Sequence, residues 1–132
     1  MSRARIILVE DDAATLESFA AVLREDFAVW VARDGTHALE VAEELKWDAD
    51  AIVVDIRLGE GPRGDQFVAY YRTRARRRNV PVVVVSGAEG AYDVGRKMGA
   101  ARVLAKPVDI NVLTSTLHQL LAPPAAQEYS RS

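Results

Sequence analysis

Three acidic residues stand where the first apolar run of the chain ends. The four apolar residues 6–9 lead directly into Glu10, Asp11 and Asp12, within the stretch ILVEDDAATL, residues 7–16. Carboxylates this close together repel one another, and their burial is costly unless water, a helix N-terminus or a cation neutralises them. The sequence therefore raises the question of what balances this charge.

Three later apolar runs also end at a side chain that can do chemistry. AIVVDIRL ends its run at Asp55, VPVVVVSGAEG at Ser86 and ARVLAKP at Lys106. A carboxylate oxygen can act as a nucleophile towards phosphorus, and an ammonium and a hydroxyl can bind phosphoryl oxygens. These groups suit phosphoryl transfer if the fold brings them together.

The elements that must position these residues alternate regularly along the chain. Apolar runs predict strands over 6–9, 27–32, 51–54, 80–85 and 102–105. Apolar side chains that recur every three or four residues predict helices around 16–23, 38–45 and 110–121, with weaker helices over 64–77 and 89–98. Several strands are continuous Val, Ile and Leu, which indicates that both of their faces are covered.

This alternation predicts an α/β fold, a doubly wound five-stranded parallel sheet with right-handed crossovers and helices on both faces. Ligands of such sheets bind outside the carboxyl ends of the strands. We therefore expect the polar groups that follow the strands to gather at one edge: Glu10, Asp11, Asp55, Ser86 and Lys106. Asp12 precedes the first amphipathic stripe and is expected to cap that helix.

An oxygen-rich cluster of this kind favours a hard divalent cation. Mg²⁺ is commonly held by one or two carboxylates, with waters and phosphate oxygens completing its octahedral coordination. The cation would neutralise the repulsion within the acid pair, while Lys106 and Ser86 would contact a phosphoryl group. Asp55 opens the central loop and is best placed to accept that group.

Taken together, these motifs resemble the receiver domain of two-component response regulators over residues 3–121. The family's markers are an acidic pair after the first strand, an aspartate after the third, Ser or Thr after the fourth and Lys-Pro after the fifth. Here they read EDD, DIRLG, SGA and AKP. Each motif alone is a weak signal, whereas all of them in this order are very specific.

The resemblance implies a flavodoxin-like fold with strand order 2-1-3-4-5. It also implies that Asp55 takes a phosphoryl group from the phosphohistidine of a sensor histidine kinase or from a phosphotransfer protein, with Mg²⁺ as the cofactor. Phosphorylation would then switch a protein-interaction surface, and a homodimer through the fourth helix, fifth strand and fifth helix is a further expectation. The downstream partner and process are not given by the sequence.

Roles for single residues follow from the same resemblance. The metal ligands would be the side chains of Glu10, Asp11 and Asp55 and the backbone carbonyl of Arg57. Ser86 and Lys106 would bind the phosphoryl group and act in the switch. The remaining candidates are the modulators Arg57, Gly87, Ala88 and Val103, and Pro107 at a cis peptide bond.

The chain departs from the family pattern at three places. Val103 stands three residues before Lys106, where relatives often carry Tyr or Phe, so the aromatic half of the switch is absent. Arg57 stands two residues after Asp55, where it could contact the phosphoryl group or shield it from water. The loop GEGPRG has Gly59 in place of the usual proline and is one residue longer than common, which leaves its shape open.

Composition places these features in one domain. The chain has 132 residues, 49% of them hydrophobic and 27% charged, which predicts a single globular domain. The resemblance makes residues 1–122 a receiver domain, and the two prolines after Leu121 predict a flexible tail over 123–132. The absence of cysteine excludes disulfides and thiolate metal sites. A net charge of −2 and short apolar runs argue against nucleic-acid and membrane binding, despite the basic run YRTRARRRN, and a cytoplasmic location is expected.

Other function classes remain open at this point. The same fold could serve as a pseudo-receiver, a binding module that works without phosphorylation, although the complete polar set argues against it. A haloacid dehalogenase-type phosphatase would need a second aspartate where Arg57 stands. A flavodoxin would bind phosphate at its first loop, where the three acids would repel it. The favoured reading is a phosphoacceptor switch and not an enzyme.

Overall fold

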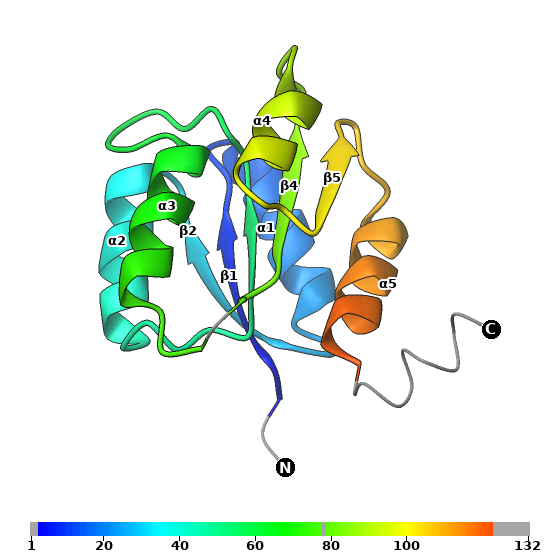
Figure 1. Cartoon of the computed structure of the whole chain (residues 1–132). Coiled ribbons are helices and arrows are strands. Elements are labelled where there is room, and N and C mark those ends of the chain that lie inside the picture. Colours follow the sequence, from blue (N-terminus) through cyan, green and yellow to red (C-terminus); the bar gives the residue numbers. More distant parts are fainter. Residues whose placement is uncertain (1–2, 78, 123–132) are drawn as a thin grey trace, which may run out of the picture.

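Strands and helices alternate along the chain in the computed structural model, which describes residues 3–77 and 79–122 (Figure 1). The elements in chain order are β1 (Arg5–Val9), α1 (Ala13–Leu23), β2 (Ala28–Ala32), α2 (Gly35–Glu44), β3 (Ala51–Val54), α3 (Gly64–Arg74), β4 (Val82–Ser86), α4 (Ala91–Lys97), β5 (Arg102–Ala105) and α5 (Ile110–Leu121). The alternation expected from the apolar runs is confirmed.

The strands form one parallel sheet in the order β2-β1-β3-β4-β5. The doubly wound fold and its strand order were both predicted and are both confirmed. Strands β3 and β4 are buried throughout and β1 is buried except at Arg5, whereas β2 and β5 at the edges are partly exposed. The expectation of two covered faces therefore holds best at the centre of the sheet.

Helices cover the two faces of the sheet and enclose two apolar layers (Figure 1). On one face, Ile52 and Val84 pack with side chains of α2 and α3, including Val41 and Phe67. On the other face, side chains of the same strands pack with α1 and α5; this layer includes Val53, Val85, Leu23, Leu113 and Leu117. Burial of both faces explains why the central strands are continuous Val and Ile.

Helix α3 is shorter than the pattern over 64–77 predicted. It ends at Arg74, and the next residue adopts an extended backbone. The backbone N–H of Arg76 then donates to the carbonyl of Trp47 at 2.9 Å, outside the helix. A contact with a distant turn thus ends the helix, which local periodicity could not reveal.

No helix in residues 3–77 and 79–122 is long and apolar enough to cross a membrane. The predicted tail over 123–132 lies outside the described residues.

Candidate phosphoryl and metal site

The register of the sheet brings the predicted site residues to one edge. Val9 of β1 lies beside Val54 of β3, so Glu10 and Asp55, one residue further on, are also neighbours. The N–H of Asp55 donates to the carbonyl of Val9 at 3.2 Å. At the other side of the sheet, the N–H of Lys106 donates to the carbonyl of Ser86 at 3.1 Å. Parallel pairing thus gathers groups that lie almost a hundred residues apart in sequence.

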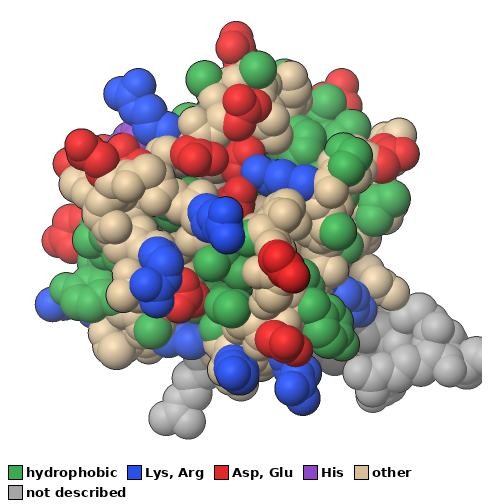
Figure 2. Space-filling view, turned by 90° about the horizontal axis from the view of Figure 1, so that it is seen from above, with side chains coloured by type: hydrophobic (Ala, Val, Ile, Leu, Met, Phe, Trp, Pro, Cys, Tyr) green, Lys and Arg blue, Asp and Glu red, His purple; other side chains and the backbone are tan. Residues whose placement is uncertain are grey.

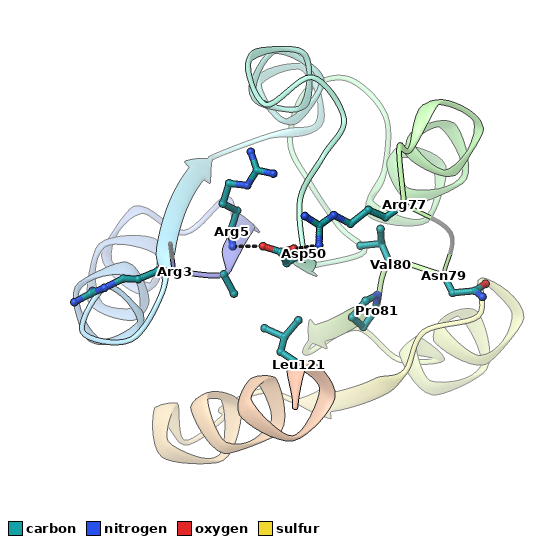
Figure 3. A pocket seen from close by; sticks show the side chains of 9 residues that line it. Arg3, Arg5, Asp50, Arg77, Asn79, Val80, Pro81 and Leu121 are labelled. Carbon is teal, nitrogen blue, oxygen red and sulfur yellow. Dashed lines mark hydrogen bonds and ion pairs between the residues drawn. The ribbon is translucent and has the colours of Figure 1, made fainter. Parts of the chain in front are cut away.

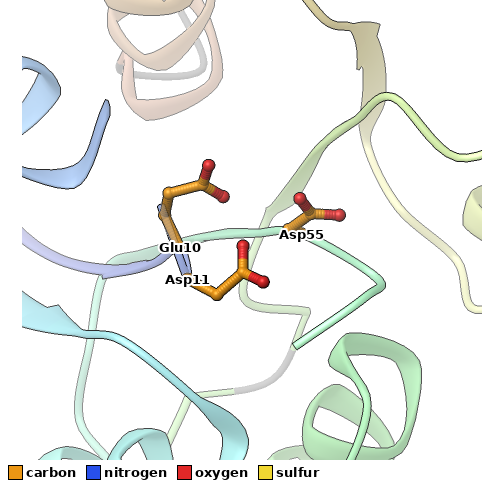
Figure 4. A group of neighbouring side chains, drawn as sticks. All are labelled: Glu10, Asp11 and Asp55. Atoms are coloured by element: carbon orange, nitrogen blue, oxygen red, sulfur yellow. The ribbon is translucent and has the colours of Figure 1, made fainter. Parts of the chain in front are cut away.

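Glu10, Asp11 and Asp55 form a carboxylate cluster at this edge (Figure 4). One carboxylate oxygen from each lies within 4.8 Å of the others. Glu10 and Asp55 are only 4% and 6% exposed, whereas Asp11 faces solvent. Three convergent oxygen donors fit a divalent cation of the Mg²⁺ type, which coordinates carboxylates and water together.

Lys106 supplies the positive charge within the cluster. Its Nζ donates to Glu10 Oε1 at 2.6 Å and to Asp55 Oδ2 at 2.7 Å. Viewed from above this edge, acidic and basic side chains lie next to one another near the centre of the face (Figure 2). The acids that seemed unbalanced in the sequence are therefore partly neutralised by a lysine from the far end of the domain.

The protonation states follow from burial and from these ion pairs. Burial raises the pKa of Glu10 above its ordinary value of 4.5, and the hydrogen bond from Lys106 opposes that rise. Burial by itself would lower the pKa of Lys106. The hydrogen bonds to Asp55 and Glu10 outweigh this effect, so the pKa of Lys106 is raised above 10.5. Lys106 is thus a permanent cation at neutral pH.

Ser86 lies at the wall of a cavity next to Lys106. The serine is 3% exposed, and its Oγ accepts a hydrogen bond from the N–H of Ala88 at 3.2 Å. The cavity, about 360 Å³ in volume, is lined by both residues together with Gly87, Ala88 and Val103, among others. The small side chain of Val103 therefore borders an open space between α4 and β5, close to the cluster.

Arg57 approaches the cluster with its backbone. Its N–H donates to Asp55 Oδ1 at 3.2 Å, while its side chain is exposed and makes no hydrogen bond or ion pair with the described residues. The peptide bond between Lys106 and Pro107 is cis, as the resemblance implied.

Asp12 takes no part in the cluster and caps α1, as expected. Its carboxylate accepts from the N–H of Thr15 at 2.9 Å. Hydrogen bonds from the Thr15 side chain and backbone lower the pKa of Asp12 below 3.8. Of the three adjacent acids, two thus face the site and one begins the helix.

A second cavity, of about 800 Å³, lies at the opposite edge of the sheet (Figure 3). Two arginines beside it are paired with acids: Arg5 with Asp48 at 2.6 Å, and Arg77 with Asp48 at 2.9 Å and also with Asp50. Arg77, which belongs to the basic run YRTRARRRN, is therefore paired with acids within the fold. The acids in WDAD, just before β3, were the available signal, and sequence reasoning missed their role.

Comparison with known proteins fits this geometry. Residues 6–118 match the family described as response regulator receiver domain. The chain belongs to this family. Receiver domains of response regulators act in two-component signalling, and most are signal transducers and not enzymes.

Two relatives differ in how much of their own length this chain covers. The chain is 34% identical over 108 residues to the DNA-binding response regulator MtrA of Mycobacterium leprae, covering 80% of this chain and 45% of MtrA. It is 29% identical over 122 residues to Protein PilH of Pseudomonas aeruginosa, covering 90% and 98% of the two chains. The chain thus spans less than half of MtrA but nearly all of PilH.

Solved structures agree on the fold of the receiver domain. The chemotaxis protein CheY4 of Vibrio cholerae superposes with a TM-score of 0.80 at 24% identity, over 91% of this chain and 100% of CheY4. At that identity, the likeness supports the fold alone.

Proposed function

We propose that this receiver domain accepts a phosphoryl group on Asp55. The observation that supports this most is the meeting of three functions at one edge: a buried carboxylate nucleophile, a lysine 2.7 Å from it and a cluster of further carboxylates. The donor would be the phosphohistidine of a sensor histidine kinase or of a phosphotransfer protein, in line with the family.

In the proposed transfer, a carboxylate oxygen of Asp55 attacks the phosphorus atom of the phosphohistidine. A phosphorus–oxygen bond forms while the phosphorus–nitrogen bond breaks, and its electron pair stays on the imidazole nitrogen. Lys106, already paired with Asp55, would move its ammonium to the phosphoryl oxygens. Ser86 would donate a hydrogen bond from its hydroxyl to the same group from the cavity wall.

The carboxylates of Glu10, Asp11 and Asp55, with the backbone carbonyl of Arg57, would hold Mg²⁺. When bound, Mg²⁺ would offset the negative charge that accumulates between the carboxylates and the phosphoryl oxygens. The chain's own contribution is to keep these oxygen donors close together on the ends of buried strands, so that little reorganisation is needed.

Phosphorylation would add about 1.5 to 2 negative charges at Asp55. Movement of Lys106 and Ser86 towards them would shift α4, β5 and α5 between two populations, because both residues line the cavity between α4 and β5. The output would be a contact with a downstream protein or a second copy of the chain through this face. We infer a switch of this kind in the cytoplasm and no turnover of substrate.

The test is the intact mass of the protein after incubation with acetyl phosphate or phosphoramidate. We expect a gain of one phosphoryl group that requires Mg²⁺ and is lost in Asp55→Asn. A folded protein that gains nothing under any condition would instead be a binding module that works without phosphorylation.

A further inference from the structure

The loop between β3 and α3, residues 55–63, lies against the N-terminus of α2. The carbonyl of Glu60 accepts hydrogen bonds from the N–H groups of Gly35 at 2.9 Å and Thr36 at 3.3 Å. The carboxylate of Asp34 accepts from the N–H of His37 at 2.7 Å. The first turn of α2 is therefore capped partly by its own Asp34 and partly by the loop that carries Arg57.

This contact is too close for any side chain at Gly35. A Cβ there would lie 2.0 Å from the carbonyl oxygen of Pro62, where real Cβ contacts are essentially never below 3.0 Å. Gly61 meets α2 in the same way from the loop side, because its φ is +77° and a Cβ would lie 2.3 Å from Thr36 Oγ1. Two glycines thus allow the loop backbone to lie directly on the helix.

If a side chain were introduced at Gly35, the loop would have to give way. Helix α2 is held in the core by Ala38, Val41 and Ala42, all of them buried. Pro62 is only half-buried, and its neighbour Gly61 is exposed. Relief of the contact from 2.0 Å to beyond 3.0 Å would therefore displace the loop by roughly 1 Å.

Such a displacement reaches the site because both ends of the loop are fixed. The N–H of Gly64 donates to the carbonyl of Ile56 at 2.8 Å and closes the loop at its base. Arg57 follows that base directly and is bound through its N–H to Asp55. Residues 57–63 connect these two fixed points. A shift at Pro62 therefore changes the backbone path of the whole segment, including Arg57.

We propose that Gly35 is a positioning residue for the site, since its contact with Pro62 sets the conformation of the loop that carries Arg57, whose backbone carbonyl would be a metal ligand. This inference rests on the proposed function. According to this inference, the start of α2 influences the metal affinity of the cluster although it lies outside it. By linkage, a cation in the cluster must also stabilise the contact between α2 and the loop.

The first experiment compares Gly35→Ala with Gly59→Ala, a matched change in the same loop where a Cβ meets no atom within 4 Å. We expect the Mg²⁺ dissociation constant of Gly35→Ala, measured by isothermal titration calorimetry, to rise roughly tenfold. Its rate of phosphorylation by acetyl phosphate should fall at low Mg²⁺ and recover at saturating Mg²⁺. Gly59→Ala should match the wild type in both readouts.

These readouts separate positioning from stability and from the proposed function. A Gly35→Ala protein with a lower Tm but wild-type Mg²⁺ affinity would overturn the inference and leave the proposed function intact. A wild type that neither binds Mg²⁺ nor takes a phosphoryl group would overturn both. Gly61→Ala, which disturbs the contact from the other side, should weaken Mg²⁺ binding in the same direction.

A measurement on the wild type keeps the inference testable even if these variants do not fold. Amide hydrogen exchange at Gly35 and Thr36 reports how often the loop leaves the start of α2. Saturation with Mg²⁺ should slow exchange at both amides by about fivefold or more. Unchanged exchange, in a protein whose Asp55 amide responds to Mg²⁺, would overturn the inference.

Discussion

Lys106 decides the charge balance of the acidic cluster. It contacts the two buried carboxylates directly, so the repulsion between them is offset before any metal binds. A divalent cation and the lysine would therefore compete for Glu10 and Asp55. The same competition would release the ammonium to meet the phosphoryl group.

Replacing Lys106 by methionine should make the domain depend on Mg²⁺ for its stability. Without Mg²⁺, we expect the free energy of unfolding to fall by about 2 kcal/mol, less than for a fully buried pair because the lysine side chain is 28% exposed. Added Mg²⁺ should then raise Tm more in Lys106→Met than in the wild type. The control is Lys97→Met, which removes an exposed lysine on α4. An equal rise in Tm with Mg²⁺ in the wild type, Lys106→Met and Lys97→Met would contradict this account.

Arg57 offers a test of phosphoryl lifetime. Its guanidinium is exposed two residues after Asp55 and makes no hydrogen bond or ion pair within the described part of the chain, so it is available to cover a phosphoryl group. We expect dephosphorylation of Arg57→Ala to be roughly tenfold faster, the factor given by a loss of about 1.4 kcal/mol of shielding. Arg76→Ala removes an exposed arginine near the opposite edge and should decay like the wild type. Equal decay of all three would mean that Arg57 does not protect the phosphoryl group.

At the scale of single residues, the sequence could predict which side chains come together at the carboxyl edge of the sheet. Strand ends in a parallel sheet share an edge, so the convergence of Glu10, Asp55 and Lys106 followed from topology alone. The contact of Gly35 with Pro62 could not be foreseen, because it joins the start of α2 to a distant loop whose conformation local sequence does not determine. Close backbone approach leaves no trace in hydrophobic periodicity.

At the scale of the element, the boundaries of helices and strands show where local sequence is enough to predict them. Asp12 was predicted to begin α1, and it does, because an aspartate before an amphipathic stripe satisfies the free N–H groups. Strand β4 was predicted from Val80 but begins at Val82. Pro81 has no N–H for the ladder, although its carbonyl still accepts from Ile52 at 3.0 Å. The cap at Asp12 was thus foreseen from local chemistry. Pro81 was an equally local signal that the strand prediction overlooked, and the end of α3 depends on a contact with a distant turn.

Variants at Asp12 should separate a helix cap from a metal ligand. Asp12→Ala leaves the N–H of Thr15 without its acceptor and should lower the free energy of unfolding by about 1 kcal/mol. Asp12→Ser keeps an acceptor and should restore most of this loss, measured by urea unfolding. Mg²⁺ affinity should stay within about twofold of the wild type in both variants. A large loss of Mg²⁺ binding in Asp12→Ser would show that this carboxylate belongs to the metal site.

At the scale of the whole molecule, the two edges of the sheet carry different electrostatic arrangements. The carboxyl edge holds three acids, two of them paired with one lysine, and their carboxylate oxygens lie close enough together to share a cation. At the amino edge, Asp48 joins Arg5 of β1 to Arg77 beyond α3, so acids and bases there are matched within the fold. The basic run that could have suggested nucleic-acid binding thus contributes to holding the elements together.

This network predicts an acid-dependent part of the stability. Hydrogen bonds from Arg77 and then Arg5 lower the pKa of Asp48 below 3.8. A carboxyl whose pKa is lower in the folded than in the unfolded state stabilises the fold above the unfolded pKa. That stability is lost as the pH falls through 3.8 towards the folded pKa.

Asp48→Asn should therefore be less stable than the wild type at neutral pH, and the difference in unfolding free energy should shrink as the pH falls to about 3. Urea unfolding across this range measures it, with Glu25→Gln, an exposed carboxylate that makes no ion pair with the described residues, as the control. A difference between wild type and Asp48→Asn that does not vary with pH would show that Asp48 acts through packing and neutral hydrogen bonds instead of its charge.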